Sequence, residues 1–354
     1  MGILKKNTHS DDLSRSGPPQ IPSLDWNDLY HRTSLVSCLV QGVYAMERDR
    51  KKKRNGSESL ATPWWKSFNF TLVESETLYD ARDGSIYGAV FQNVINYENT
   101  PDSIVPPRYV IALRGTAPTM NDVLHNIRVP FETLHHGGRY KHVIEEIRYF
   151  VAKHGNTAVW IAGHSLGAGL ALLAGKNMAM SGLPVEAYIF NPPISLMPIE
   201  QYGYNHTLNC VYRFTRDIIK AGIAKVLDLD EGQEGPRYKN LVSWRPHLFV
   251  NQSDVICSEY IGYFNHVVNM TEAGLGEISR LASGYSVRRM LIGDGENWSS
   301  SSSPDHLHFL PSAFMMVNKT ESSEFYDNHG IHQWWNHMLK QSATFNSYYS
   351  MNYL

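Results

Sequence analysis

The chain has 354 residues, of which 42% are hydrophobic, 19% charged and 12% aromatic, a composition that excludes disordered and fibrous proteins. Its 32 Lys and Arg residues nearly balance 34 Asp and Glu residues, so no overall basic field recruits nucleic acid. The three cysteines (Cys38, Cys210 and Cys257) are widely spaced and no apolar run suits a signal peptide or a membrane span, which predicts free thiols in a cytoplasmic protein.

Residues 1–25 mix Ser, Pro, Asp and Lys without periodicity, which is typical of a flexible N-terminal tail. We predict that residues 26–354 form a single domain with an N-terminal helical extension over 26–57. In that extension, apolar residues from Leu29 to Val43 recur at intervals of three and four, and Asn55-Gly56-Ser57 follows as a stop signal.

The remaining pattern alternates between strands and helices. Short β-branched and aromatic runs predict strands over 68–73, 85–91 and 108–113. A helix that contains Val143 and Ile147 ends near Gly155, and a wholly apolar run predicts a buried strand over 158–162. The order continues as helix 166–181, strand 185–190, helical region 194–230, strand 247–251, helix 271–292, strand 313–318 and helix 331–341. This alternation predicts an α/β fold, a mainly parallel central sheet with helices on both faces.

One motif within this alternation indicates chemistry. Gly163-His164-Ser165-Leu166-Gly167 fits the pattern G-x-S-x-G, between a predicted strand and a predicted helix. A nucleophile elbow needs a sharp turn at the serine, with minimal side chains two residues before and after it, and Gly163 and Gly167 meet that need. The alternative interpretation is a glycine-rich turn with an incidental serine.

The segment GHSLGAGLALLAG, together with Ala112-Leu-Arg-Gly-Thr116, resembles the class 3 lipases of the α/β-hydrolase superfamily, and particularly their plant lipase-like members. The resemblance covers about residues 85–340. It implies an oxyanion hole formed by Thr116 and the backbone N–H of Leu166, two donors facing the charge that develops on an attacked carbonyl oxygen. Thr116 also fits a helix N-cap or a turn. Residues 117–138 occupy the position of a lid, or of an amphipathic helix packed on the core.

In this fold the catalytic acid follows the nucleophile in the chain and precedes the histidine. Asp254 ends an apolar strand that opens into a polar turn, which is the place expected for a triad acid. Asp217 is the other candidate, but helical spacing continues through it. We favour Asp254 as the acid; the alternative interpretation of this residue is the N-cap of a helix starting at Val255.

The base is expected on a loop after the last strand. His329 lies in Asn-His-Gly, which predicts a loop, and His332 lies one turn on, in the predicted terminal helix. The family resemblance fits either histidine. We favour His329 as the base and keep His332 as the alternate. His164, beside the nucleophile, is expected to pack or hydrogen-bond locally.

These residues predict a serine hydrolase that cleaves carboxylic esters, with acyl lipids as substrates, no metal or organic cofactor, no nucleic acid partner, and transient contact with a membrane or lipid surface. Two alternatives stay open. A non-catalytic lipase-like scaffold or regulator would keep the fold without turnover, and an acyltransferase would use the same triad with an alcohol in place of water. The absence of a Gly-Asp-Ser-Leu block near the start argues against a GDSL-type hydrolase.

Overall fold

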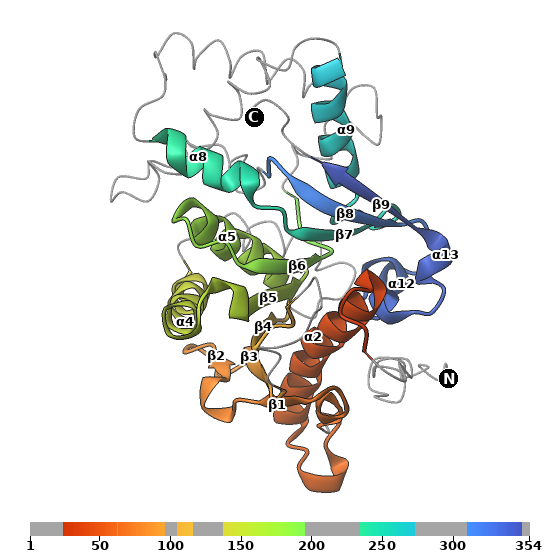
Figure 1. Ribbon diagram of the computed structural model, residues 1–354. Coiled ribbons are helices and arrows are strands. Elements are labelled where there is room, and N and C mark those ends of the chain that lie inside the picture. Colours follow the sequence, from red (N-terminus) through yellow and green to blue (C-terminus); the bar gives the residue numbers. More distant parts are fainter. Residues whose placement is uncertain are drawn as a thin grey trace.

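The computed structural model describes residues 24–61, 63–95, 105–115, 137–194, 234–272 and 310–348. A nine-stranded sheet runs through this part of the chain in the order β1-β3-β4-β5-β6-β7-β8-β9, and β2 pairs with β3 beside that path (Figure 1). The central strands β4 to β8 are parallel, whereas β1, β2, β3 and β9 pair antiparallel at the two sides. The predicted central parallel sheet is therefore confirmed.

The strands are short, as is usual for buried parallel sheets. Their bounds are β1 (Phe70–Leu72), β2 (Leu78–Tyr79), β3 (Ile86–Asn93), β4 (Tyr109–Leu113), β5 (Val159–His164), β6 (Glu186–Phe190), β7 (His247–Asn251), β8 (Ala313–Asn318) and β9 (Ala343–Tyr348). Every residue of β4, β5 and β7 is buried. This burial on both faces explains why these strands read as continuous apolar runs and not as alternating ones.

Four helices cover one face of the sheet: α4 (Gly138–His154), α5 (Leu166–Met180), α8 (Glu234–Ser243) and α9 (Glu259–Glu272). Each connects one parallel strand to the next, and right-handed crossovers between strands that follow each other in order place their helices on the same face. One apolar cluster joins this layer to the sheet, with Ile147, Leu170, Leu241 and Phe264 from the four helices.

The opposite face is covered by α2 (Leu29–Lys52) and by a 3₁₀ helix, η7 (Ile331–Trp335). A second apolar cluster contains residues of α2, residues of the sheet such as Trp160 and Phe249, and Trp334 of η7. Asp28 caps α2 by accepting a hydrogen bond from Tyr30 N. The predicted N-terminal helix is thus confirmed, and it lies across β3, β4, β5 and β6. Figure 1 shows α2 on the side of the sheet away from α4 and α5.

The C-terminal part differs from the predicted helix over 331–341. It contains α12 (Phe325–His329), η7, α13 (Leu339–Ser342) and the edge strand β9. Gly330 separates α12 from η7 with an extended backbone, and an added Cβ there would lie 2.4 Å from Tyr326 O. Extended backbone at Gly330 and again at Asn336 divides the segment into short pieces.

Two further expectations concern helices. Residues 195–230 of the predicted helical region and 273–292 of the predicted helix over 271–292 lie outside the described residues. Among the described residues, α8 was not predicted. α9 begins at Glu259, well before the predicted start at residue 271. Gly262 and the aromatic residues of α9 have modest helix propensity, and burial of Tyr260 and Phe264 against the sheet stabilises the helix instead.

Shorter 3₁₀ segments complete the described chain: η2 (Gly56–Glu58), η3 (Trp64–Phe68), η4 (Glu74–Glu76) and η6 (Asn156–Ala158). None of the helices in the described ranges combines the length and the apolar character needed to cross a membrane.

Candidate active site

Ser165 lies at the sharp turn between β5 and α5. Its backbone has φ 55° and ψ −124°, which is uncommon for a residue with a side chain and marks a strained turn. Its N–H donates to Phe190 O at 3.0 Å, which fixes the turn against β6. The predicted elbow at Ser165 is therefore present in the structure.

Gly163 and Gly167 make this turn sterically possible. A Cβ on Gly163 would lie 2.2 Å from Gly167 O, and a Cβ on Gly167 would lie 2.6 Å from the carbonyl oxygens of Leu113 and Arg114. These neighbours are backbone atoms, which cannot move aside as a side chain can. The two glycines of the motif are thus required by close packing, as predicted.

Leu166 opens α5, so its N–H belongs to the first helical turn, where donors have no acceptor within the helix and the helix dipole is positive. That position suits an oxyanion donor. Thr116, the other predicted donor, lies outside the described residues, as do Asp217 and residues 117–136 of the predicted lid. Gly115, directly before Thr116, is described and packs against the turn, because an added Cβ would lie 2.8 Å from Ser165 Cβ.

Asp254 and His329 meet at the carboxyl edge of the sheet. Asp254 follows β7, is fully buried, and accepts a hydrogen bond at Oδ2 from His329 Nδ1 at 2.8 Å. Its Oδ1 accepts Ile256 N at 3.0 Å. Asp254 therefore forms an Asx turn at a position also predicted as a helix N-cap, and α9 begins only at Glu259.

Two more donors reach Oδ2 of Asp254. Asn191 Nδ2 lies at 2.7 Å and the thiol of Cys257 at 3.0 Å. Burial raises the pKa of the Asp254 carboxyl, but the charge and hydrogen bond of His329, with the hydrogen bonds of Cys257 and Asn191, leave it below its usual value. Asp254 is thus held as a carboxylate.

The hydrogen bond to Asp254 determines which nitrogen of His329 is available. A carboxylate only accepts, so Nδ1 of His329 donates its proton, and whenever the ring carries a single proton its Nε2 is an acceptor. Among the described residues, both Nε2 of His329 and Oγ of Ser165 are buried without a hydrogen-bond partner. An acceptor nitrogen on a histidine oriented by a carboxylate suits a proton acceptor, and an unpartnered hydroxyl at a strained turn suits a nucleophile.

His332 is placed differently from His329. Its Nε2 lies 3.8 Å from Oδ1 of Asp327, and its ring stacks on Tyr326 with centroids 4.9 Å apart. The structure therefore brings His329, and not His332, to Asp254. The expected loop around His329 is wrong, because His329 is the last residue of α12, while His332 lies in η7 and not in a longer terminal helix.

The main chain around His329 is fixed by side chains from other elements. Gln333 Nε2 donates to Asn328 O at 2.8 Å and to Gly330 O at 3.0 Å, and His164 Nε2 reaches His329 O at 2.7 Å. Three successive carbonyl groups are thus held, which orients the imidazole from its backbone as well as from Asp254.

Two residues of the site were not found from the sequence. Asn191 directly follows β6 and has φ 45°. Its Oδ1 accepts a hydrogen bond from Trp334 Nε1 at 2.6 Å, so Asn191 connects Trp334 of η7 to Asp254. An asparagine directly after an apolar strand, where positive φ is tolerated, was the available signal. Tyr44 is the second, since its hydroxyl lies 2.8 Å from His164 Nδ1.

The hydrogen-bond partners of His164 are not its neighbours in the sequence, although local hydrogen bonding was one of the two expectations for this residue. Its partners, Tyr44 and the carbonyl of His329, lie 120 and 165 positions away. Burial, and then the charge of His329, lower the pKa of His164 to about 3, so its ring is neutral at physiological pH.

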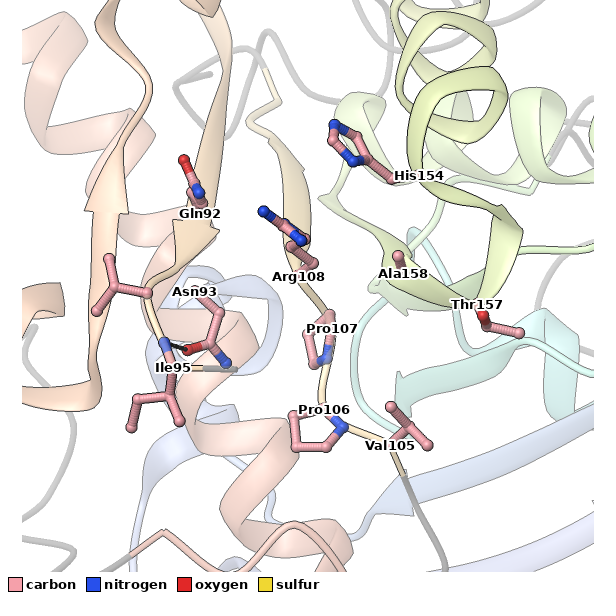
Figure 2. A pocket seen from close by; sticks show the side chains of 11 residues that line it. Gln92, Asn93, Ile95, Val105, Pro106, Pro107, Arg108, His154, Thr157 and Ala158 are labelled. Atoms are coloured by element: carbon pink, nitrogen blue, oxygen red, sulfur yellow. Dashed lines mark hydrogen bonds between the residues drawn. The ribbon is translucent and has the colours of Figure 1, made fainter. Parts of the chain in front are cut away.

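A described cavity of about 300 Å³ lies elsewhere, at the amino ends of β4 and β5. Figure 2 shows Asn93, Arg108, Pro107 and His154 around it. Ligand sites of open α/β sheets lie at the carboxyl ends of the strands, where Ser165, Asp254 and His329 are found. The cavity is therefore separate from the candidate active site.

Taken with the mainly parallel sheet, the strained Ser165 after β5 and the hydrogen-bonded pair of Asp254 after β7 and His329 after β8 fit an α/β-hydrolase. Comparison with known proteins agrees. The family model of "Lipase (class 3)" matches residues 55–216. A protein of Arabidopsis thaliana named "GDSL esterase/lipase" is 37% identical over 342 residues, which cover 92% of this chain and 94% of that protein.

The chain therefore belongs to the class 3 lipases and is a carboxylic ester hydrolase of the α/β-hydrolase fold. The word GDSL belongs to the name of the Arabidopsis relative, whereas the nucleophile segment of this chain is Gly163-His164-Ser165-Leu166-Gly167. A solved lipase of Rhizopus microsporus var. chinensis is similar with TM-score 0.35 and 13% identity, over 68% of this chain and 74% of that chain, which is too distant to carry an argument.

Proposed function

We propose that this enzyme cleaves the esters of acyl lipids with Ser165 as nucleophile, His329 as general base and Asp254 as the acid that orients His329. One observation carries the assignment. The hydrogen bond from His329 Nδ1 to Asp254 leaves Nε2 as a buried acceptor, in a site where the serine hydroxyl is also buried and unpartnered among the described residues.

The reaction follows from these roles. Oγ of Ser165 attacks the ester carbonyl while Nε2 of His329 takes the hydroxyl proton. The N–H of Leu166, with Thr116, stabilises the oxyanion. When the tetrahedral intermediate collapses, His329 gives its proton to the departing alcohol and Ser165 keeps the acyl group. Water then attacks the acyl-enzyme, with His329 as base again, and the carboxylic acid leaves.

Acyl lipids are proposed as substrates because the family acts on carboxylic esters and the Arabidopsis relative is named an esterase/lipase. The buried position of Ser165 suits an acyl group that enters a water-poor site, and contact with a lipid surface would deliver it. We also propose a cytoplasmic location, since the described cysteines, Cys38 and Cys257, are free thiols.

The test is a series of p-nitrophenyl esters from acetate to palmitate, assayed with wild type, Ser165→Ala and Ser181→Ala. Ser181 follows the same helix α5, and its Oγ bonds Asn177 O in an exposed position, so it is a matched control. We expect turnover to rise with acyl length, to vanish in Ser165→Ala and to persist in Ser181→Ala.

A fluorophosphonate probe gives an independent readout, because it reacts only with an activated serine. Peptide mapping should place the adduct on Ser165. Folded wild-type protein that neither turns over any ester nor takes up the probe would support the scaffold alternative. Transfer of the acyl group to an added alcohol without release of free acid would support the acyltransferase.

A further inference from the structure

Helix α2 holds the backbone beside the nucleophile through two of its side chains. The N–H of Gly115 donates to the hydroxyl of Tyr44 at 2.8 Å. The carbonyl of Gly115 accepts Nη1 of Arg114 at 2.6 Å, and Nη2 of Arg114 lies 3.7 Å from Oε1 of Glu47. Tyr44 and Glu47 are three residues apart and therefore share one face of α2. Both polar groups of Gly115 are thus fixed by α2, one directly and one through Arg114.

The directions of the hydrogen bonds around Tyr44 are all determined. The carbonyl of His329 only accepts, so Nε2 of His164 carries the proton of that 2.7 Å bond. Because the His164 ring is neutral, its Nδ1 accepts, and the hydroxyl of Tyr44 donates to it. Burial raises the pKa of Tyr44 to about 12, so the hydroxyl keeps its proton. Its oxygen remains free to accept from Gly115 N–H.

These bonds form one continuous path from the Gly115 peptide, through Tyr44 and His164, to the carbonyl of His329. The path joins the two halves of the proposed machinery: the residue before the predicted oxyanion donor Thr116, and the main chain of the proposed base. The groups that fix Gly115 therefore hold the backbone directly before Thr116, which itself lies outside the described residues.

We infer that Tyr44 and His164 are positioning residues, which hold the backbone of Gly115, beside Ser165, and the backbone of His329 in place relative to each other. The inference rests on the proposed function. Neither residue transfers a proton to substrate. Both act through other groups, since Tyr44 contacts Gly115 and His164, and His164 contacts Tyr44 and the backbone of His329.

Removal of the Tyr44 hydroxyl tests the positioning role separately from the contribution of the Tyr44 ring to the stability of the fold. Tyr44→Phe keeps the ring but leaves Gly115 N–H and His164 Nδ1 without their partner. We expect kcat/KM for p-nitrophenyl butyrate to fall about 10- to 100-fold, less than the 10²- to 10³-fold cost of deleting an oxyanion donor itself. The loss should appear in kcat, because these contacts matter most in the transition state.

A tetrahedral adduct provides a readout that a merely structural role would not move. The affinity for a trifluoromethyl ketone, which forms a hemiketal oxyanion on the serine, should weaken in Tyr44→Phe by about the same factor as kcat/KM. The matched control is Tyr30→Phe, on the same helix, whose hydroxyl donates to Trp335 O at 3.3 Å. Tyr30→Phe also removes one hydrogen bond between α2 and the C-terminal segment. It should nevertheless leave both kcat/KM and the affinity for the trifluoromethyl ketone unchanged.

His164 supplies a second pair of variants. His164→Gln keeps an amide donor for the carbonyl of His329, and His164→Leu keeps none, so the glutamine variant should retain several-fold more activity. The inference is overturned if folded Tyr44→Phe matches wild type in kcat and inhibitor affinity, or if His164→Gln and His164→Leu are equally active. Failure of the proposed function looks different: wild type itself would show no turnover that depends on Ser165.

Discussion

The Nε2 atom of His332 lies 3.8 Å from Oδ1 of Asp327, in a pair whose side chains are both partly exposed. Three residues earlier, His329 faces the fully buried carboxylate of Asp254. Two histidines that are neighbours in sequence thus belong to two different acids. This separation makes each pair a control for the other.

His329→Ala should lower kcat at least about 10³-fold, because no other group described in the site offers a free acceptor for the Ser165 proton. His332→Ala should change kcat less than about threefold and lower the melting temperature slightly through loss of its stacking on Tyr326. Both quantities are measured on the same preparations with p-nitrophenyl butyrate and circular dichroism. Loss of turnover in His332→Ala alone would reverse the assignment of the base.

Asp254→Asn should lower kcat on the order of 10⁴-fold, as in the archetypal serine protease triad. The amide can donate where the carboxylate only accepts, which disfavours the tautomer of His329 with its proton on Nδ1. Asp327→Asn is the matched control and should leave kcat unchanged. Equal activity of the two variants, with both folded, would remove Asp254 from the proposed triad.

Gly163→Ala should destabilise the protein by about 3 kcal/mol or more, since the new Cβ would meet the backbone of Gly167 at 2.2 Å. Gly138→Ala should instead stabilise it by up to about 1 kcal/mol. Gly138 begins α4 and has open space around its Cα, so alanine there only restricts the unfolded chain. Urea unfolding measures both. A Gly163→Ala variant as stable as wild type would contradict the packing described for the elbow.

Glu146 on α4 makes stability depend on pH. Burial, and then the negative charge of Glu76, raise the pKa of Glu146 from its ordinary value of 4.5 to about 7. Between these pH values the folded chain keeps a proton that the unfolded chain has lost. The stability that this protonated group provides is therefore complete below about pH 4.5 and is lost as the pH rises through 7.

Glu146→Gln, which is neutral at every pH, should accordingly melt at a higher temperature than wild type at pH 8. The difference should shrink as the pH falls below 7 and disappear near pH 4. Glu145→Gln is the control, because Glu145 is exposed beside it on the same helix. A gap for Glu146→Gln that stays constant from pH 8 to pH 4 would show that ionisation of Glu146 is not its cause.

The sequence predicts the parts of this fold in which one segment is enough to determine the structure. β7 and β8 occupy the predicted ranges, because a buried parallel strand is a compact apolar run. β9 was missed because its residues are mostly exposed or half-buried, and an edge strand with a polar sequence gives little signal. The terminal helix was predicted too long because Ile331, Trp334 and Trp335 pack in the cluster with α2 as a short 3₁₀ helix, and the backbone is extended at Asn336 directly after it.

The residues of the candidate site also fall into those that the sequence predicts and those that it does not. Ser165 follows from a local motif, and Asp254 and His329 follow from chain order combined with the ends of strands. Tyr44 has no such signal, and Asn191 has only its place directly after an apolar strand, since their partners Gly115 and Asp254 lie 71 and 63 positions away. Which side chains hold a catalytic group in place depends on packing between distant segments, and that is visible only in the structure.

The contact between α2 and η7 has a consequence for synthesis. Tyr30, near the start of α2, bonds the carbonyl of Trp335, 305 positions later, and Lys340 pairs with Asp28 at 2.9 Å. At 5 to 20 residues per second, a ribosome needs roughly 15 to 60 s to make the intervening chain. For that period the face of α2 that η7 covers has no partner, and from the synthesis of Ser165 until that of His329 the proposed nucleophile has no base. The proposed triad is therefore complete only when synthesis reaches the segment that covers this surface.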